Sequence, residues 1–437
     1  MKKTIEIKKL GINGEGIGYL NRKIVFVSGA LPGEEVVVEI VKQNRGYSEG
    51  KLVKILKASK NRVEPMCPLY ENCQGCNMMH MTYESQLQEK KEAVKETLKK
   101  YTEYDLKSVD FSDVIASKQS TGYVCEVNLP IVSFNDKITF GIYQRESKYL
   151  TLMTGCLMHH PLVNHCLKEL KNILTKNKCR IYNDRFKTGL RFLKLKLIED
   201  KIQLVFVTGR DGLSDNLVKQ ISEIPNVAGI FMAVNTSKYQ NFDESKYSKL
   251  YGLSRLELHH DNKRYLLGVK TELNKSVDLI FKENEIVKEM ICDSKKIIAT
   301  NVKAALLELN LDQEEIIALD NKTYQVEDAK LNAKYLKRDN VKFVAGKIED
   351  KIVTYAKKKC YDTLIIHDSG KKLSEKIINT IKIARFDTVI YISDSYSALA
   401  KDIALLQNSY SLKQVVPIDT SCHNTYLTTI VKLVRKK

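Results

Sequence analysis

The sequence predicts a multidomain α/β protein: a small amino-terminal β-barrel, a central α+β region and a carboxyl-terminal doubly wound parallel sheet. The first 58 residues alternate short period-two strands with glycine-rich turns, which is typical of a small barrel. After about residue 285, apolar strands alternate with helical stretches, as in sheets of parallel strands. The length of 437 residues exceeds a single core, and 43% hydrophobic content suffices for several.

The barrel is expected over residues 1–58. Its strands are predicted at 5–7, 23–27, 35–41 and 49–55, and eight glycines punctuate them. The loop at 42–47 combines basic side chains with Tyr47, which suits contacts with a nucleic acid. The barrel is therefore a candidate nucleic-acid-binding domain.

The central region is expected over residues 59–270 and the parallel sheet over 271–437. A cysteine-rich loop leads into a helix at 83–100, and the remainder of the central region carries strands at 131–134, 190–198 and 203–207. In the last region the alternating stretches are 296–299, 302–309, 315–319, 327–336, 341–344, 363–367, 374–383 and 388–393. The stretch at 302–309 is the first helix expected there.

The net charge of +18 favours a polyanionic partner, and nucleic acid is the natural candidate. The sequence carries no secretory segment and no run of about 18 apolar residues, so we expect a cytoplasmic protein with no membrane contact. Ten cysteines in such a chain indicate a reducing compartment, where clustered thiols tend to hold metal.

Three of these thiols, Cys67, Cys73 and Cys76, have the spacing C-x5-C-x2-C within one tight loop. Thiolates at this spacing suit either an iron–sulfur cluster or zinc, and a fourth ligand is needed. Spacing alone does not choose among the four candidates for it, which are Cys125, Cys156, Cys166 and Cys179.

A resemblance to a known family starts at this loop. Residues 67–90 read CPLYENCQGCNMMHMTYESQLQEK, which resembles the cluster loop of the RNA uracil-5-methyltransferases that act on 23S ribosomal RNA and transfer RNA. The resemblance implies a 4Fe-4S cluster. It also implies Cys156 as the fourth ligand, because the G-x-Y-x-R-x-S segment at 141–147 precedes it as in the family. Gln74 replaces a family glycine.

The same resemblance implies that the barrel is a TRAM domain, similar to an OB-fold, and that the last region is a Rossmann-like class I methyltransferase fold. The family reaction uses a cysteine that adds to C6 of uracil, S-adenosylmethionine as methyl donor, and a glutamate that removes the C5 proton. The family's nucleophile segment matches 391–402, which places Asp394 at the cysteine position. The base segment matches from Asp419 and places Thr428 at the glutamate position.

Other family motifs are also degenerate. The D-P-P-R motif corresponds to residues 367–371, where both prolines are absent. No glycine occurs between Gly268 and Gly346, although a methyltransferase wraps its cofactor with a glycine-rich turn after the first strand. Asp320, at the end of the second strand, is the residue that matches the family's ribose-binding acid. Binding of S-adenosylmethionine is therefore doubtful.

We thus predict an RNA-binding, catalytically inactive member of this family, a monomer whose partner is structured RNA, ribosomal RNA in particular. The alternative is an active 23S ribosomal RNA uracil-5-methyltransferase with a displaced nucleophile, for which Cys292, Cys360 and Cys422 are the thiols in the last region. A radical S-adenosylmethionine enzyme is disfavoured, because it would use C-x3-C-x2-C and leave one iron open.

Overall fold

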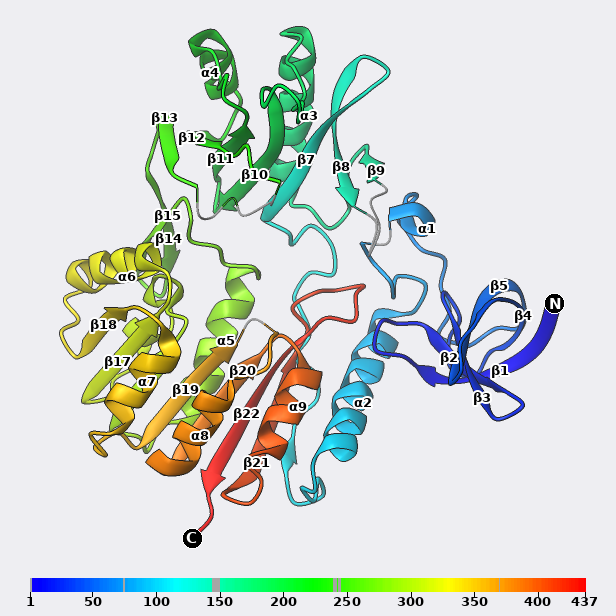
Figure 1. The fold of residues 1–437 in the computed structure, drawn as a ribbon, viewed down its shortest axis with the longest axis vertical. Coiled ribbons are helices and arrows are strands. Elements are labelled where there is room, and N and C mark those ends of the chain that lie inside the picture. The colour runs from blue at the N-terminus through cyan, green and yellow to red at the C-terminus, as the bar shows by residue number, and fades with distance from the viewer. Residues whose placement is uncertain (1, 74, 144–149, 239–241, 243–244, 369) are drawn as a thin grey trace. The chain divides into compact units, whose positions relative to one another are not determined.

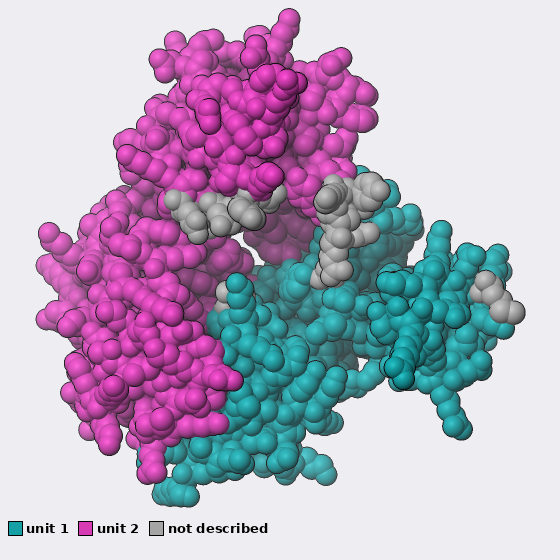
Figure 2. Space-filling model, viewed as in Figure 1, with its two compact units in different colours: residues 1–120, 368–373, 391–437 teal, residues 121–367, 374–390 magenta. Residues whose placement is uncertain are grey.

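The computed structural model describes residues 2–73, 75–143, 150–238, 242, 245–368 and 370–437. Figure 1 traces the chain, and Figure 2 colours its two compact units. The first unit comprises residues 1–120, 368–373 and 391–437, and the second comprises 121–367 and 374–390. Each unit combines segments that lie far apart in the sequence.

The first unit begins with a closed barrel in which the strand order is β1-β2-β3-β5-β4. The strands are β1 (Lys2–Leu10), β2 (Gly16–Leu20), β3 (Lys23–Val27), β4 (Glu35–Gln43) and β5 (Tyr47–Lys57). Alternate side chains such as Ile5, Ile7, Val36 and Val38 fill its core. The predicted barrel is confirmed. Sequence patterning missed β2, whose glycines resemble a turn.

The rest of the first unit contains the short helix α1, the long helix α2, the helix α9, the short strand β6 and the two carboxyl-terminal strands. Its elements are α1 (Tyr70–Cys73), α2 (Tyr83–Tyr101), β6 (Asp110–Phe111), α9 (Tyr396–Ala404), β21 (Tyr410–Ile418) and β22 (Thr428–Arg435). Strands β21 and β22 pair antiparallel, and β6 pairs parallel with β21. Helix α2 buries Gln86, Lys90, Val94 and Leu98, a stripe at four-residue spacing, and packs on α9.

The second unit contains a seven-stranded sheet with the order β13-β12-β11-β10-β7-β8-β9. Its strands are β7 (Glu126–Phe134), β8 (Lys137–Tyr143), β9 (Leu150–Met153), β10 (Leu190–Ile198), β11 (Lys201–Thr208), β12 (Val227–Val234) and β13 (Tyr247–Gly252). Helices α3 (Pro161–Lys176) and α4 (Asp215–Ser222) bury apolar side chains in the core that this sheet shares with them. This is the expected α+β arrangement.

The second unit also carries four parallel strands of the carboxyl-terminal region, in the order β18-β17-β16-β19. They are β16 (Lys296–Thr300), β17 (Glu315–Asp320), β18 (Val341–Ala345) and β19 (Thr363–Asp368), of which Asp368 belongs to the first unit. Strand β20 (Thr388–Ser393) is likewise divided between the two units. The remaining elements are β14 (Arg255–His260), β15 (Lys263–Gly268), α5 (Val277–Met290), α6 (Thr323–Tyr335), α7 (Ile348–Ala356) and α8 (Glu375–Ala384).

The expected helix at 302–309 is wrong. Two 3-10 turns, Lys303–Ala305 and Glu308–Asn310, stand in its place. Asn301, Lys303, Ala304 and Ala305 all have positive φ, which interrupts an α-helix at its first turn. Within the described residues, no helix is long and apolar enough to cross a membrane.

Candidate functional site

The positions that match the family's nucleophile and base lie side by side in the first unit. Asp394 directly follows β20, and Thr428 is the first residue of β22. The buried Thr428 hydroxyl donates a hydrogen bond to Asp394 Oδ1 at 2.6 Å. The resemblance leads one to expect a thiolate and a base at these two positions, and the structure has a hydroxyl bound to a carboxylate.

A second carboxylate lies next to this pair. Ser393 Oγ donates to Asp368 Oδ2 at 3.0 Å, and the Ser395 amide donates to Ser393 Oγ at 3.1 Å. Burial raises the pKa of Asp368, and the neighbouring charge of Asp394 raises it further. Asp368 belongs to the degenerate D-P-P-R segment, in which residue 369 lies outside the described residues. Among the described residues, the groups that lie together here are the carboxylates of Asp368 and Asp394 and the hydroxyls of Ser393 and Thr428, with no thiol among them.

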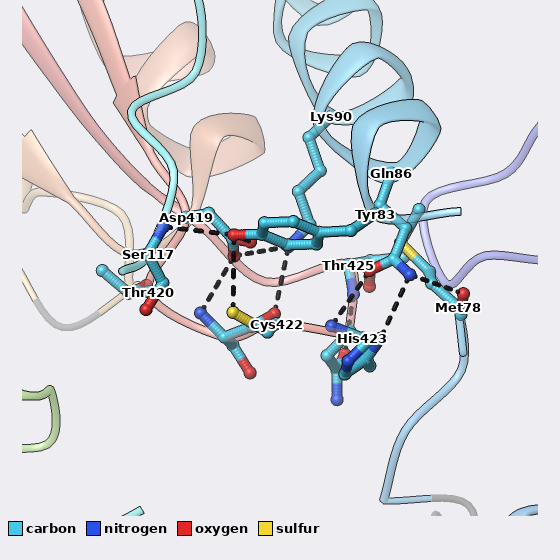
Figure 3. A network of polar contacts seen from close by, with 12 residues as sticks. Met78, Tyr83, Gln86, Lys90, Ser117, Asp419, Thr420, Cys422, His423 and Thr425 are labelled. Atoms are coloured by element: carbon cyan, nitrogen blue, oxygen red, sulfur yellow. Dashed lines mark hydrogen bonds and ion pairs between the residues drawn. The ribbon is translucent and has the colours of Figure 1, made fainter. Parts of the chain in front are cut away.

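The segment that begins at Asp419 is held by α2 through a buried polar network (Figure 3). Lys90 Nζ lies 2.6 Å from Asp419 Oδ1 and donates to the Ser421 carbonyl at 3.0 Å. Tyr83 Oη donates to Asp419 Oδ2 at 2.9 Å. The Lys90 and Asp419 side chains are 2% and 0% exposed. The network therefore anchors the turn that leads to Thr428.

The thiol of Cys422 belongs to the same network. Cys422 is buried, and its Sγ lies 3.5 Å from Tyr83 Oη and 3.6 Å from the Gln119 carbonyl. Burial raises the pKa of this thiol to about 11, and the charge of Asp419 contributes. A thiol that stays protonated at neutral pH is a poor nucleophile. The other two thiols of the alternative, Cys292 and Cys360, are exposed in the second unit.

The proposed cluster ligands are divided between the units. Cys67, Cys73 and Cys76 are partly buried in the loop around α1, whereas Cys156 belongs to the second unit. In the parts of the chain that the structure describes, no three His, Cys, Asp or Glu side chains gather closely enough to hold a metal ion. The three thiols are thus not arranged as a ready ligand set. Gln74 and residues 144–147 of the preceding motif lie outside the described residues.

Asp320 is the last residue of β17 and is buried. Its Oδ2 accepts from the Val302 amide at 2.9 Å and its Oδ1 accepts from the Lys322 amide at 2.7 Å. Burial raises the pKa of this carboxyl, and the two amide bonds oppose that shift. Asp320 therefore fixes the backbone after β16 and β17 with both of its oxygens.

The strand order places a topological switch point between β16 and β19, where ligands of such sheets bind at the carboxyl ends of the strands. Here side chains cross that crevice. Asn301 Nδ2 donates to the His367 carbonyl, and Lys303 Nζ lies 3.4 Å from His367 Nε2. Asn301 and Lys303 have the positive φ that a glycine-rich turn would supply. The turn keeps a glycine-like backbone but carries side chains, so these residues do not fit S-adenosylmethionine.

A buried charged group continues behind the crevice. Glu283 lies 3.7 Å from His367 Nδ1 and 2.7 Å from Lys275 Nζ. Burial, reinforced by the charge of Lys303, lowers the pKa of His367 well below its usual value. Sequence reasoning missed Lys303 and this group. The signal that was available is the polar content of the segment that replaces the glycine-rich turn.

Comparisons with known proteins agree with this architecture. A TRAM domain model matches residues 2–53. An uncharacterized RNA methyltransferase of Halalkalibacterium halodurans is 30% identical over 430 residues, which cover 95% of this chain and 92% of that protein. Another, from Bacillus cereus, is 29% identical over 443 residues and 99% of this chain.

Among solved structures, the Pyrococcus abyssi tRNA (uracil-54, C5)-methyltransferase in complex with S-adenosyl-L-homocysteine matches with a TM-score of 0.79. The match covers 99% of this chain and 100% of that chain at 20% identity, so it shows a shared fold and nothing beyond the fold. The methyltransferase fold predicted for the last region is thereby confirmed. With the barrel, the fold and a near full-length relative in agreement, this chain belongs to the family of TRAM-containing RNA methyltransferases.

Proposed function

We propose that this protein binds structured RNA, ribosomal RNA in particular, and no longer performs the family's methylation of uridine at C5. The observation that carries the proposal is the hydrogen bond between Thr428 and Asp394. Addition to C6 of uracil needs a soft, ionised nucleophile, and a carboxylate engaged with a hydroxyl is a poor one. Thr428 also leaves the C5 proton of an adduct without a base.

The cofactor side supports the same proposal. Asn301 and Lys303 reach His367 across the crevice in which a methyl donor would lie. Two independent losses, in the nucleophile pair and in the cofactor turn, make inactivity the simplest reading of this chain. The net charge of +18 and the TRAM-type barrel remain as features suited to RNA.

The test is incubation of the purified chain with unmodified ribosomal RNA and tritiated S-adenosylmethionine, with calorimetry on the cofactor alone and filter binding on the RNA. We expect RNA binding without 5-methyluridine, and cofactor binding that is weak or undetectable. Reproducible 5-methyluridine that Cys360→Ala or Cys422→Ala abolishes would establish the displaced-nucleophile enzyme instead. Absence of RNA binding would reject the proposal itself.

We also propose that Cys67, Cys73, Cys76 and Cys156 hold a 4Fe-4S cluster whose assembly draws the loop thiols together. Four thiolates suit such a cluster, and metal binding commonly organises a site that is loose without the metal. Iron and sulfide analysis of anaerobically purified protein should give about four of each per chain. Stoichiometric zinc without iron would contradict the assignment.

A further inference from the structure

Three loops lie next to one another where strands β10, β11 and β12 of the seven-stranded sheet begin or end. Strand β10 starts at Leu190, opposite Thr208 at the end of β11, and Thr208 also pairs with Val234 at the end of β12. The loops before β10, after β11 and after β12 therefore lie at the same end of these three strands (Figure 1). In the described parts of these loops, no residue contributes to the Asp394–Thr428 pair or to the crevice between β16 and β19.

The loop before β10 holds Phe186 out to solvent. The ring is 65% exposed, although the backbone around it is firmly tied. Asn183 Oδ1 accepts from the amides of Arg185 and Phe186 at 2.9 and 3.2 Å, and the Lys187 amide donates to the Asn183 carbonyl at 2.7 Å. The Arg210 amide from the next loop donates to the Lys187 carbonyl at 2.8 Å. The ring is thus presented on a fixed support.

A single exposed apolar side chain is ordinary, so the surroundings decide its meaning. The Arg185 guanidinium lies 5.5 Å from the Phe186 ring centroid. Arg191 lies 4.9 Å from the Tyr182 ring and donates to the Ser237 carbonyl at 2.9 Å, beside Lys238. A hydrogen bond from Lys187 lowers the pKa of Asp184, and the charges of Lys238 and Arg191 lower it further.

The cations of these loops outnumber the anions. Among the described residues, the cations are Lys178, Arg180, Arg185, Lys187, Arg210, Lys238 and Lys246, with Arg191 at the start of β10, against Asp184 and Asp211; Asp243 and Glu244 of the last loop lie outside the described residues. Asp211 is engaged by the Gly189 amide at 2.8 Å, and Asp184 by Lys187 at 2.6 Å. A fixed aromatic face surrounded by cations is the arrangement that binds single-stranded nucleic acid, because bases stack on the ring while cations neutralise phosphates.

We propose that Phe186 is a stacking platform for an unpaired base of the bound RNA, with the surrounding arginines and lysines contacting the adjacent phosphates. The inference rests on the proposed function, which supplies the RNA. An unpaired base is required because the bases of an A-form duplex are stacked on one another and present no face to a side chain. Docking of a protein partner on Phe186 is the competing outcome.

The first experiment compares Phe186→Ala, Phe186→Leu and Phe186→Tyr in the full chain, using an unstructured polyuridylate oligonucleotide. Loss of one stacking contact should weaken binding by about 5- to 150-fold in the alanine variant. The leucine variant should be similarly weak, because it keeps apolar bulk without a ring, and the tyrosine variant should bind normally. The matched control is Tyr335→Ala: this tyrosine is 48% exposed beneath Arg264 but is carried by α6.

The second experiment uses the absence of tryptophan from the sequence. Phe186→Trp introduces a single indole whose emission reports stacking directly, and Tyr335→Trp is its control. Polyuridylate should quench the emission of the first variant and leave the second unchanged. A duplex with the same number of phosphates should quench neither.

The outcomes separate the two proposals. If native protein binds the oligonucleotide and Phe186→Ala binds equally well, with unquenched emission in Phe186→Trp, the platform is rejected and the proposed function stands. Docking of a protein partner on Phe186 would then be the remaining explanation for the exposed ring. If the native chain binds no RNA, both proposals fall together.

Discussion

The buried pair of Lys90 and Asp419 makes a quantitative prediction about the segment that leads to Thr428. Lys90→Met keeps most of the side-chain volume and removes the charge. It deletes the contact to Asp419 Oδ1 at 2.6 Å and the hydrogen bond to the Ser421 carbonyl at 3.0 Å. Asp419 stays buried and keeps two donors, Tyr83 Oη and the Ser421 amide.

Breaking a buried ion pair by removing one partner costs about 3–5 kcal/mol. The two remaining donors to Asp419 offset part of this, so we take the lower end of the range, about 3 kcal/mol. That free energy corresponds to a rise of roughly 150-fold in the population in which the segment is open. The control is Lys91→Met, because Lys91 pairs with Asp113, whose side chain is 95% exposed. Such a surface pair contributes about 0–1 kcal/mol.

The thiol of Cys422 reports the opening, because it is 1% exposed and lies within the network. Its alkylation by iodoacetamide should proceed through the open state, at a rate proportional to the open population. Mass spectrometry of the peptide that contains Cys422 gives this rate, and the exposed Cys360 serves as internal reference. We expect the ratio of the Cys422 alkylation rate to the Cys360 alkylation rate to increase roughly 150-fold for Lys90→Met and less than about fivefold for Lys91→Met.

Equal alkylation rates in the two variants would refute the reasoning and show that the buried pair contributes no more than a surface one. Asp419→Asn, alone and combined with Lys90→Met, completes the double-mutant cycle, since it also removes the uncompensated carboxylate. The double variant should open less readily than Lys90→Met alone. If the increase in open population in the double variant equals the product of the increases in the two single variants, the two residues act independently.

Four further predictions concern the site and its surroundings. Asp394→Cys with Thr428→Glu should form no 5-methyluridine, because Asn301 and Lys303 still cross the crevice; tritium transfer from S-adenosylmethionine measures this. Cys73→Ala should lose most of its iron, with Cys292→Ala as the control thiol. RNA affinity should fall steeply between about 50 and 200 mM salt, and a flat response would show that the charge of +18 plays no part. Alkylation of Cys422 should rise about tenfold per pH unit between pH 7 and 9, because its thiol has a pKa of about 11 and ionises only above that range.

Patterns of period and glycine spacing predicted the barrel and the alternating last region, because local sequence determines these features. They missed β2, where Gly16 and Gly18 suggest a turn. A Cβ on Gly16 would come within 2.7 Å of the Ala30 carbonyl oxygen, so this glycine allows close approach inside a strand. The helix expected at 302–309 failed because tertiary contacts override helix propensity there. Ala304 donates to Gln325 Oε1 and accepts from Asn332 Nδ2 in a left-handed conformation.

The candidate site divides in the same way. Motif spacing identified Asp394 and Thr428, and the structure brings the two together. Motif spacing did not reveal that Lys303 reaches His367, because that contact depends on β16 lying beside β19. The pairing of Lys90 with Asp419, which spans 329 positions, also has no local pattern. Lys90 belonged to the family motif, but its partner could be found only in three dimensions.

The replaced positions are accommodated rather than merely damaged. A buried polar group without a partner costs roughly 1–3 kcal/mol, so several neglected substitutions would leave an unstable fold. Here Thr428 donates to Asp394, Asn301 donates to the His367 carbonyl, and Asp320 accepts from two backbone amides. Each group that replaces or survives from the family machinery is thus bonded within its own unit. Such pairing keeps the folded surface intact, and the proposed RNA-binding role requires an intact surface.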